Sequence, residues 1–124
     1  MSSGTNKPIF SKGGLCKIKG FRGRTFELRE NTWKKHILKD RSRWHLKSQF
    51  DKVLETLRRP DCILQSPGER NVASYVRKFE NFIIWGTVSV TAYLYVLVNL
   101  KNNKIRTVYD NPKLKRWKRI WPKN

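Results

Sequence analysis

Two histidines are the side chains best suited to proton transfer near neutral pH, because an unperturbed imidazole titrates at about pH 6.5. They are His36 and His45, and both lie in a basic stretch in the first half of the chain. His36 adjoins Trp33 and Ile37, which are four residues apart and would share the buried face of a helix. Asp40 follows one turn later and could orient the His36 ring. A lone histidine at the edge of an apolar helix face is more often structural, so this pattern leaves both roles open.

Hydroxyl and cationic side chains recur on two expected strands. The first strand carries Tyr75, Arg77 and Lys78, and the second carries Arg106, Thr107 and Tyr109. Successive strand residues point to opposite faces of a sheet, so Tyr75 shares a face with Arg77, and Thr107 shares one with Tyr109. These groups could position or protonate a substrate, or they could simply form a polar sheet face in water.

The sequence lacks the common signatures of phosphate, zinc and serine chemistry, namely a Gly-rich phosphate loop, zinc-ligand spacing and a nucleophile elbow. Its nine acidic residues are scattered, whereas a two-metal nuclease needs clustered carboxylates. If the chain cuts a nucleic acid, we therefore expect cleavage without a metal or other cofactor. That favours RNA, whose 2′-hydroxyl can be the internal nucleophile. The reaction needs a base for the 2′-OH proton, an acid for the leaving 5′-oxygen and cations for the phosphorane.

The charge of the chain points to a polyanionic partner. Lys and Arg number 28 against nine Asp and Glu, which gives a formal net charge of +19 on 124 residues. Such an excess makes a small domain repel itself, and a nucleic acid explains it through counterion release from phosphates. An anionic membrane surface and an acidic protein partner are the alternatives. We expect RNA, and tRNA or another structured RNA would suit it.

The location expected from the sequence is cytoplasmic. The first 14 residues contain no apolar signal segment. Cys16 and Cys62 have no metal-ligand spacing and read as two buried thiols in a reducing compartment, with a disulfide in an exported domain as the alternative. The stretch from Asn81 to Leu100 is uncharged and long enough to span a bilayer. Its Val, Thr, Tyr and Ile content favours one or two strands instead, so we expect no stable membrane insertion.

The elements that must position these residues follow from periodicity. We expect a flexible leader over 1–14, a single nuclease-like domain over 15–111 and a basic, Trp-containing tail over 112–124. The expected elements are strands at Leu15–Lys19 and Arg24–Arg29, helices from about Asn31 to Lys39 and from Ser48 to Pro60, and strands at Cys62–Gln65, Val72–Phe79, within Phe82–Leu100 and at Lys104–Tyr109. Asn102-Asn103 predicts a tight hairpin turn. The order predicts an α+β fold, with N-terminal helices packed on an antiparallel sheet of about four or five strands.

The tail combines cations with indole rings. Its charged and aromatic residues are Lys113, Lys115, Arg116, Trp117, Lys118, Arg119, Trp121 and Lys123. A last helical turn would place Trp117 and Trp121 on one face, because they are four residues apart. The two rings could dock on the sheet, or the segment could be an arm that grips phosphates and stacks on bases.

Several short motifs resemble one family of small nucleases. They are Trp33-Lys-Lys-His36-Ile37 through Asp40-Arg41, Val53-Leu-Glu-Thr-Leu57, Pro60-Asp61, Tyr75-Val-Arg77, Leu94-Tyr-Val-Leu-Val98 and Ile105-Arg-Thr-Val-Tyr109, in that order. Together they resemble the phage- and toxin-associated branch of the barnase/EndoU/colicin/RelE-like ribonuclease fold, from about Phe21 to Asn111.

The resemblance implies metal-independent RNA cleavage on an α+β scaffold. His36 matches the functional histidine that a helix carries before an Ile, and Thr107 and Tyr109 match the Thr-x-Tyr of the last strand. Tyr75 matches the tyrosine of the earlier strand. Many members have a second histidine where this chain has Arg41, which suits phosphate binding but stays protonated and cannot shuttle a proton. The basic Trp-containing tail is not explained by the resemblance.

Three hypotheses follow. The first is a toxin-like or phage-associated ribonuclease, in which His36 acts as base or acid, Arg41 and Arg77 hold the phosphate, and Thr107 and Tyr109 position or protonate. The second is a non-catalytic RNA- or DNA-binding module on the same fold. Its contacts would come from Arg43, His45, Lys78, Arg106, Lys115, Arg116, Trp117, Lys118, Arg119 and Trp121. The third adds an acidic immunity or antitoxin protein, attracted by the positive charge.

Overall fold

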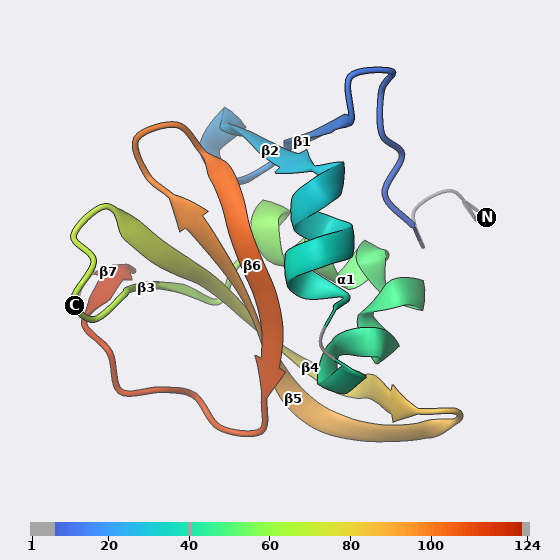
Figure 1. The fold of residues 1–124 in the computed structure, drawn as a ribbon. Helices are drawn as coiled ribbons and strands as arrows, with labels where there is room; N and C mark the ends of the chain where they lie inside the picture. Colours follow the sequence, from blue (N-terminus) through green and yellow to red (C-terminus); the bar gives the residue numbers. More distant parts are fainter. Residues whose placement is uncertain (1–6, 40, 123–124) are drawn as a thin grey trace.

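The computed structural model describes residues 7–39 and 41–122, apart from the side chains of Arg41 and Ser42. Over this part of the chain the strands form one mixed sheet of seven strands, in the order β1-β2-β6-β5-β4-β3-β7 (Figure 1). The strands are β1 (Leu15–Lys19), β2 (Thr25–Arg29), β3 (Cys62–Gln65), β4 (Val72–Trp85), β5 (Val88–Asn99), β6 (Lys104–Asn111) and β7 (Arg119–Trp121). Neighbouring strands are antiparallel except β2 and β6, which meet in parallel at Glu27 and Lys104.

The helical segments lie mainly between β2 and β3. They are the 3-10 helix η2 (Phe21–Gly23), the π-helix η3 (Thr32–Ile37), the 3-10 helix η4 (Arg41–Ser48) and the α-helix α1 (Phe50–Arg58). Phe50, Val53 and Leu57 are buried along one stripe of α1, as their spacing predicts. Pro60 follows the helix and cannot continue it.

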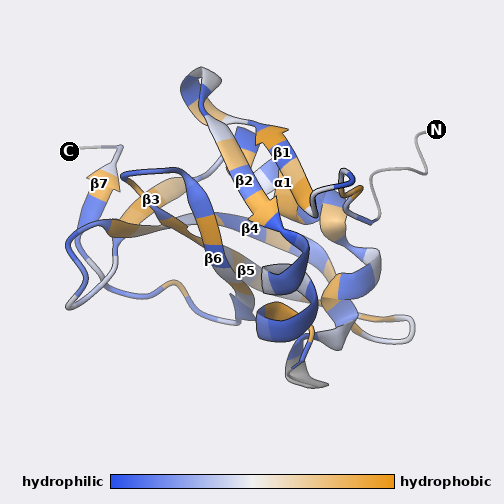
Figure 2. Cartoon of the chain, turned by 45° about the horizontal axis from the view of Figure 1, so that its top comes forward, coloured by the Kyte–Doolittle hydropathy of each residue, from blue (hydrophilic) through white to orange (hydrophobic). Residues whose placement is uncertain are grey.

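The two faces of the sheet carry different side chains. Directly paired residues of antiparallel strands point to the same face, so the pairing register shows which core residues lie on each face of the sheet. One face turns Tyr75, Val96 and Val108 towards the helices, where the main core forms. The opposite face carries Val76 and Tyr95 in a smaller cluster under the C-terminal segment. Figure 2 shows hydrophilic and hydrophobic residues alternating along the strands, as two faces with different surroundings require.

The α+β class is confirmed, but two details of the expected architecture are wrong. The sheet has seven strands rather than four or five, because the N-terminal hairpin and the tail both join it. The helices are not N-terminal, since β1 and β2 precede η3, η4 and α1. Periodicity reveals where strands occur, but it does not reveal which strands pair to extend a sheet.

The uncharged stretch from Asn81 to Leu100 belongs to a long hairpin of two strands. β4 runs to Trp85, β5 begins at Val88, and Gly86 adopts a positive φ of 52° in the turn between them. In residues 7–39 and 41–122 no helix is long and apolar enough to cross a membrane.

Both ends of the described chain pack against the domain. In the expected leader, residues 1–6 lie outside the described part, but Phe10 packs on the main core. The tail does not form a helical turn: residues 112–118 run across the sheet, and β7 pairs with β3. Cys16 and Cys62 are free thiols, and burial raises the pKa of each.

Candidate functional site

Arg43 joins the histidine-bearing helical segments to the strand that carries Thr107 and Tyr109. One guanidinium nitrogen donates to Thr107 Oγ1 at 2.9 Å and to the His36 carbonyl at 3.3 Å. The guanidinium carbon also lies 6.0 Å from the centre of the Tyr109 ring. Arg43 belongs to η4, and residues 106–111 of β6 have no strand partner beyond them on that side. The arginine therefore reaches across this open edge of β6, which we call the β6 edge.

The second histidine is held beside the same edge. His45 Nε2 lies 2.6 Å from Asp110 Oδ1, and the two side chains are only 11% and 19% exposed. The edge of the imidazole ring packs on Phe82, with the ring centres 5.4 Å apart. Asp110 is therefore fixed on the helix side of β6, while Thr107 and Tyr109 lie on the other face. This arrangement suits His45 to position the η4 segment more than to contact a substrate.

The side chain of Gln49 fixes the backbone next to His45. Gln49 is 2% exposed, and its amide nitrogen donates to the carbonyls of His45 and Ile83 at 2.9 and 2.7 Å. Its amide oxygen accepts the Ile83 N–H at 3.0 Å. The end of η4 is thus tied to the long β4–β5 hairpin by three hydrogen bonds from one buried residue.

An aromatic cluster lies on the tail side of the sheet, beginning at the β6 edge. Tyr95 and Tyr109 stack with ring centres 5.0 Å apart and an interplanar angle of 2°. Lys115 Nζ lies 5.0 Å from the centre of the Tyr109 ring, 5.8 Å from that of Tyr95 and 4.5 Å from that of Trp117. A cation over several ring faces is attracted by their quadrupoles. We call Tyr95, Tyr109, Lys115 and Trp117 the aromatic–lysine cluster.

The Tyr95 hydroxyl anchors the tail on this face. It donates to the Lys113 carbonyl at 3.0 Å and accepts the Lys115 N–H at 2.9 Å. Burial raises the pKa of Tyr95, although the hydrogen bond from Lys115 opposes the shift. The hydroxyl is therefore protonated at neutral pH, and the tail is docked as an extended segment on the sheet.

His36 is exposed and lies on the outer side of η3. It lines a pocket of about 410 Å³ together with Glu27, Arg29 and Arg106. Arg106 forms an ion pair with Glu69 and is half exposed. The pocket therefore combines an imidazole, a carboxylate and two guanidinium groups, which are group types that acid–base cleavage of a phosphodiester can use. Asp40, the expected partner of His36, lies outside the described residues, as does the side chain of Arg41.

Tyr75 and Arg77 share a face, as alternation predicts, but they lie away from the β6 edge. Both point to the helix side of the sheet. The Arg77 side chain binds the C-terminal end of α1. Its Nε lies 3.0 Å from Glu55 Oε2, and its guanidinium donates to the Arg59 carbonyl at 2.6 Å. Tyr75 is 2% exposed and lines a separate pocket. The structure thus brings neither residue to the His36 pocket or to the contact between Arg43 and Thr107. The His36 ring does not share a pocket with Thr107 or Tyr109 either, and only its backbone carbonyl is linked to Thr107, through Arg43.

Most of the other expected nucleic-acid contacts fall on the tail side. Lys78 is exposed and pairs across the sheet with Tyr93. Arg116, Lys118 and Arg119 are exposed along the tail. Trp117 packs on the smaller cluster, whereas Trp121 packs on the main core, so the two indoles do not share one face.

Sequence reasoning did not single out Asp110, Glu27 or Gln49. Asp110 could have been identified from the sequence. It lies two residues after Val108 on a strand of alternating pattern, so its side chain is expected to point to the same, inward-facing side. A carboxylate at such a position needs a partner, and two histidines were available. Glu27 enters its pocket only through the parallel contact of β2 with β6, which no local pattern predicts.

Comparisons with models of known protein families, with curated proteins and with solved structures found no match for this chain.

Proposed function

We propose that the protein is a ribonuclease that cleaves RNA at the β6 edge by attack of the 2′-hydroxyl, without a metal ion. The observation that carries this proposal is the hydrogen bond from Arg43 to Thr107, which spans 64 positions of sequence. It joins η4 with the strand β6, which carries Thr107 and Tyr109, and the same guanidinium nitrogen reaches the His36 carbonyl. These segments carry His36, Thr107 and Tyr109, which are three of the residues that the ribonuclease resemblance implies; the fourth, Tyr75, lines a separate pocket.

The side chains offer the three functions that the reaction needs. His36 is exposed and can exchange a proton with the 2′-hydroxyl or the leaving 5′-oxygen. Arg43 supplies fixed positive charge and has donors left for phosphate oxygens beyond those that bond Thr107 and the His36 carbonyl. Tyr109 stacks on Tyr95 beside Arg43 and can support a base or donate its hydroxyl proton. The His45–Asp110 pair positions η4, and thereby Arg43.

Replacing His36 by Ala is expected to lower RNA cleavage by about 10²- to 10⁴-fold, the usual contribution of a positioned acid or base. The side chain is exposed, so the variant should unfold at the same temperature as the wild type. The assay is single-turnover cleavage of labelled tRNA and total RNA in EDTA, with Lys35→Ala as the matched control. Lys35 is the exposed neighbour of His36 on η3. Equal cleavage by the two variants would remove His36 from the mechanism.

A second function, RNA binding without turnover, is favoured by the aromatic–lysine cluster. Stacked rings under a cation, flanked by exposed Arg116 and Lys118, form a surface of the kind that binds single strands by stacking and phosphate contact. This function would coexist with cleavage, or replace it if the purified protein shifts RNA without cutting it.

Neutralising Arg116 and Lys118 together is expected to flatten the salt dependence of RNA binding. Each lost phosphate contact lowers the slope of log K against log salt by about 0.7 for a single strand, so the double Gln variant should lose about 1.4. A Lys12→Gln, Lys101→Gln variant removes the same charge from exposed positions off the tail. If both double variants change the slope equally, the effect comes from net charge, and the tail has no specific role in binding.

A further inference from the structure

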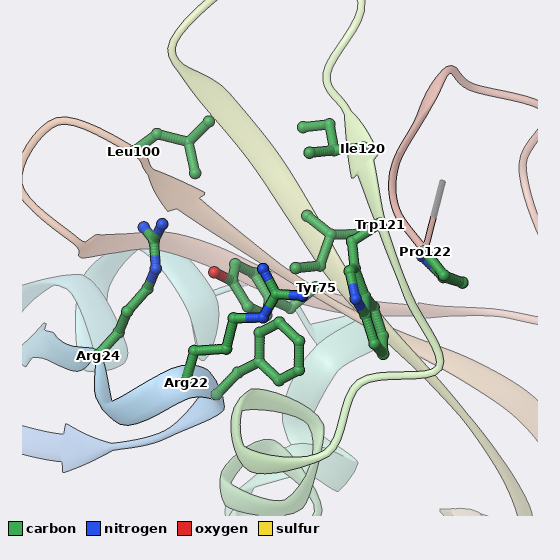
Figure 3. A pocket seen from close by; sticks show the side chains of 9 residues that line it. Arg22, Arg24, Tyr75, Leu100, Ile120, Trp121 and Pro122 are labelled. Atoms are coloured by element: carbon green, nitrogen blue, oxygen red, sulfur yellow. The ribbon is translucent and has the colours of Figure 1, made fainter. Parts of the chain in front are cut away.

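A pocket lies apart from the β6 edge. It has a volume of about 650 Å³ and opens between η2, the β5–β6 turn and the C-terminal end of β7. Its lining includes Ile63 of β3, Tyr75 of β4, Phe21 and Trp121. Figure 3 shows Tyr75, Trp121, Arg22 and Arg24 around the pocket. A volume of this size falls within the roughly 300–1,000 Å³ typical of small-ligand sites.

Two guanidinium groups at the pocket have no acidic partner. Arg22 and Arg24 both line it, and neither forms an ion pair within residues 7–39 and 41–122. Arg22 lies over the Phe21 ring at 5.1 Å, and its backbone adopts a left-handed φ of 57°, which a non-glycine residue rarely holds. Such strain is concentrated at functional positions. Paired, uncompensated arginines are suited to a phosphate group, which they can grip with several charge-assisted hydrogen bonds.

The Tyr75 hydroxyl is the part of this buried residue that reaches the pocket, and it has no hydrogen-bond partner in the described part of the chain. The residue as a whole is 2% exposed. Figure 3 shows the hydroxyl on the side of the pocket where the Arg22 and Arg24 side chains lie. Burial raises the pKa of Tyr75, and the charges of Arg24 and Arg22 oppose the shift, which agrees with this placement. A hydroxyl that faces a pocket without a protein partner can donate a hydrogen bond to a bound ligand.

The remaining wall is aromatic and apolar. Phe21 and Trp121 contact each other with ring centres 4.6 Å apart, and the remaining lining includes Leu100, Ile120 and Pro122. A planar heterocycle suits such a wall, since bases stack on aromatic side chains with little dependence on sequence. Trp121 reaches this place only because β7 pairs with the edge strand β3, so the docked tail builds part of the pocket.

From these features we propose that the pocket binds one nucleoside monophosphate group, with its base against Trp121 and Phe21 and its phosphate on Arg22 and Arg24. The Tyr75 hydroxyl donates a hydrogen bond to the ligand. The same chemistry is offered by a free mononucleotide and by one residue of an RNA strand. The proposal goes beyond cleavage at the β6 edge and does not depend on it, because the pocket shares no lining residue with that site.

The test is a titration of the full chain with AMP, GMP, CMP, UMP and inorganic phosphate, followed by ¹⁵N NMR of the Trp indole groups. Trp121→Phe identifies the indole signal of Trp121. We expect the mononucleotides to shift that signal, and we expect inorganic phosphate to bind at least about tenfold more weakly, because it cannot stack. Equal binding of phosphate and AMP, or no shift with any nucleotide, would overturn the proposal.

Single variants distinguish the effect of specific pocket contacts on mononucleotide binding from the effect of net charge. Arg24→Gln and Tyr75→Phe should each weaken mononucleotide binding, by roughly tenfold for the charged contact and less for the hydroxyl. Arg70→Gln, at an exposed arginine that does not line the pocket, should leave binding unchanged. Equal losses for Arg24→Gln and Arg70→Gln would refute the assignment. A short oligonucleotide that displaces AMP identifies RNA as the source of the ligand. An oligonucleotide that does not displace AMP identifies the free nucleotide as the ligand. His36→Ala leaves AMP binding intact in either case.

Discussion

Replacing Arg43 by Ala is expected to lower single-turnover RNA cleavage in EDTA by about 10²- to 10³-fold, the usual effect of removing one fixed donor from a developing oxyanion. The guanidinium is held by Thr107 Oγ1 and the His36 carbonyl before any substrate arrives. A cation fixed in this way stabilises the phosphorane without reorganising during the reaction. Arg43 is therefore expected to have a large effect on activity, comparable to that of His36.

The loss of activity can be separated from a loss of fold. Arg43→Ala also removes the hydrogen bonds to Thr107 and His36, which should cost about 1–2 kcal/mol of unfolding free energy, measured in urea. Cleavage is therefore compared at a temperature where both proteins are fully folded. Arg43→Lys keeps the charge but loses the planar fork, so an intermediate rate is expected. A decrease in cleavage no larger than that of Arg70→Gln, which changes the same charge on an exposed loop, would contradict the role.

Thr107→Val adds a second check on the same contact. Valine has nearly the shape of threonine but cannot accept the hydrogen bond, so Arg43 would keep its charge and lose one anchor. We expect cleavage to fall by about tenfold, less than for Arg43→Ala, because only the orientation of the cation changes. Equal losses for the two variants would mean that Thr107 itself contacts the substrate.

Local patterns predicted most of the elements because each was encoded in a short window. The observed β1 follows from the alternation at Leu15–Lys19, and α1 follows from the stripe of Phe50, Val53 and Leu57. The β5–β6 hairpin follows from the turn at Asn102-Asn103. The conformation of the tail could not be decided from the sequence, because the spacing of Trp117 and Trp121 fits a helical turn as well as an extended strand. Pairing with β3 decided between them, and that pairing joins segments more than 50 residues apart.

The site was predictable in its residue types but not in its contacts. His36, Thr107 and Tyr109 were found as separate candidates from chemistry and resemblance, whereas Arg43 was expected only as a nucleic-acid contact. Its bond to Thr107 depends on how η4 crosses the edge of β6, which is a property of tertiary packing. Tyr75 shows the opposite case: alternation placed it correctly beside Arg77, yet the sheet directs it to a different pocket from the other candidates.

Replacing Gln49 by Met is expected to have the largest effect on stability, about 2–4 kcal/mol of unfolding free energy. Methionine matches the length of glutamine but leaves the Ile83 N–H and carbonyl, and the His45 carbonyl, without their side-chain partner. Ile83 lies between two irregularities in the β4–β5 register, where strand pairing is already interrupted. Because small domains are stable by only about 5–15 kcal/mol, the loss should be plain in urea unfolding.

Gln65→Met is the matched control for this effect. Gln65 also donates from its side chain to backbone carbonyls, those of Glu69, Arg70 and Val72, but it lies near the surface. Water can replace those bonds, so a loss of about 1 kcal/mol or less is expected. If Gln49→Met costs no more than Gln65→Met, the buried amide does not fix the hairpin to η4. If it costs more, the variant should also lower RNA cleavage when fully folded, because the His45 backbone that leads to Arg43 would lose its tether.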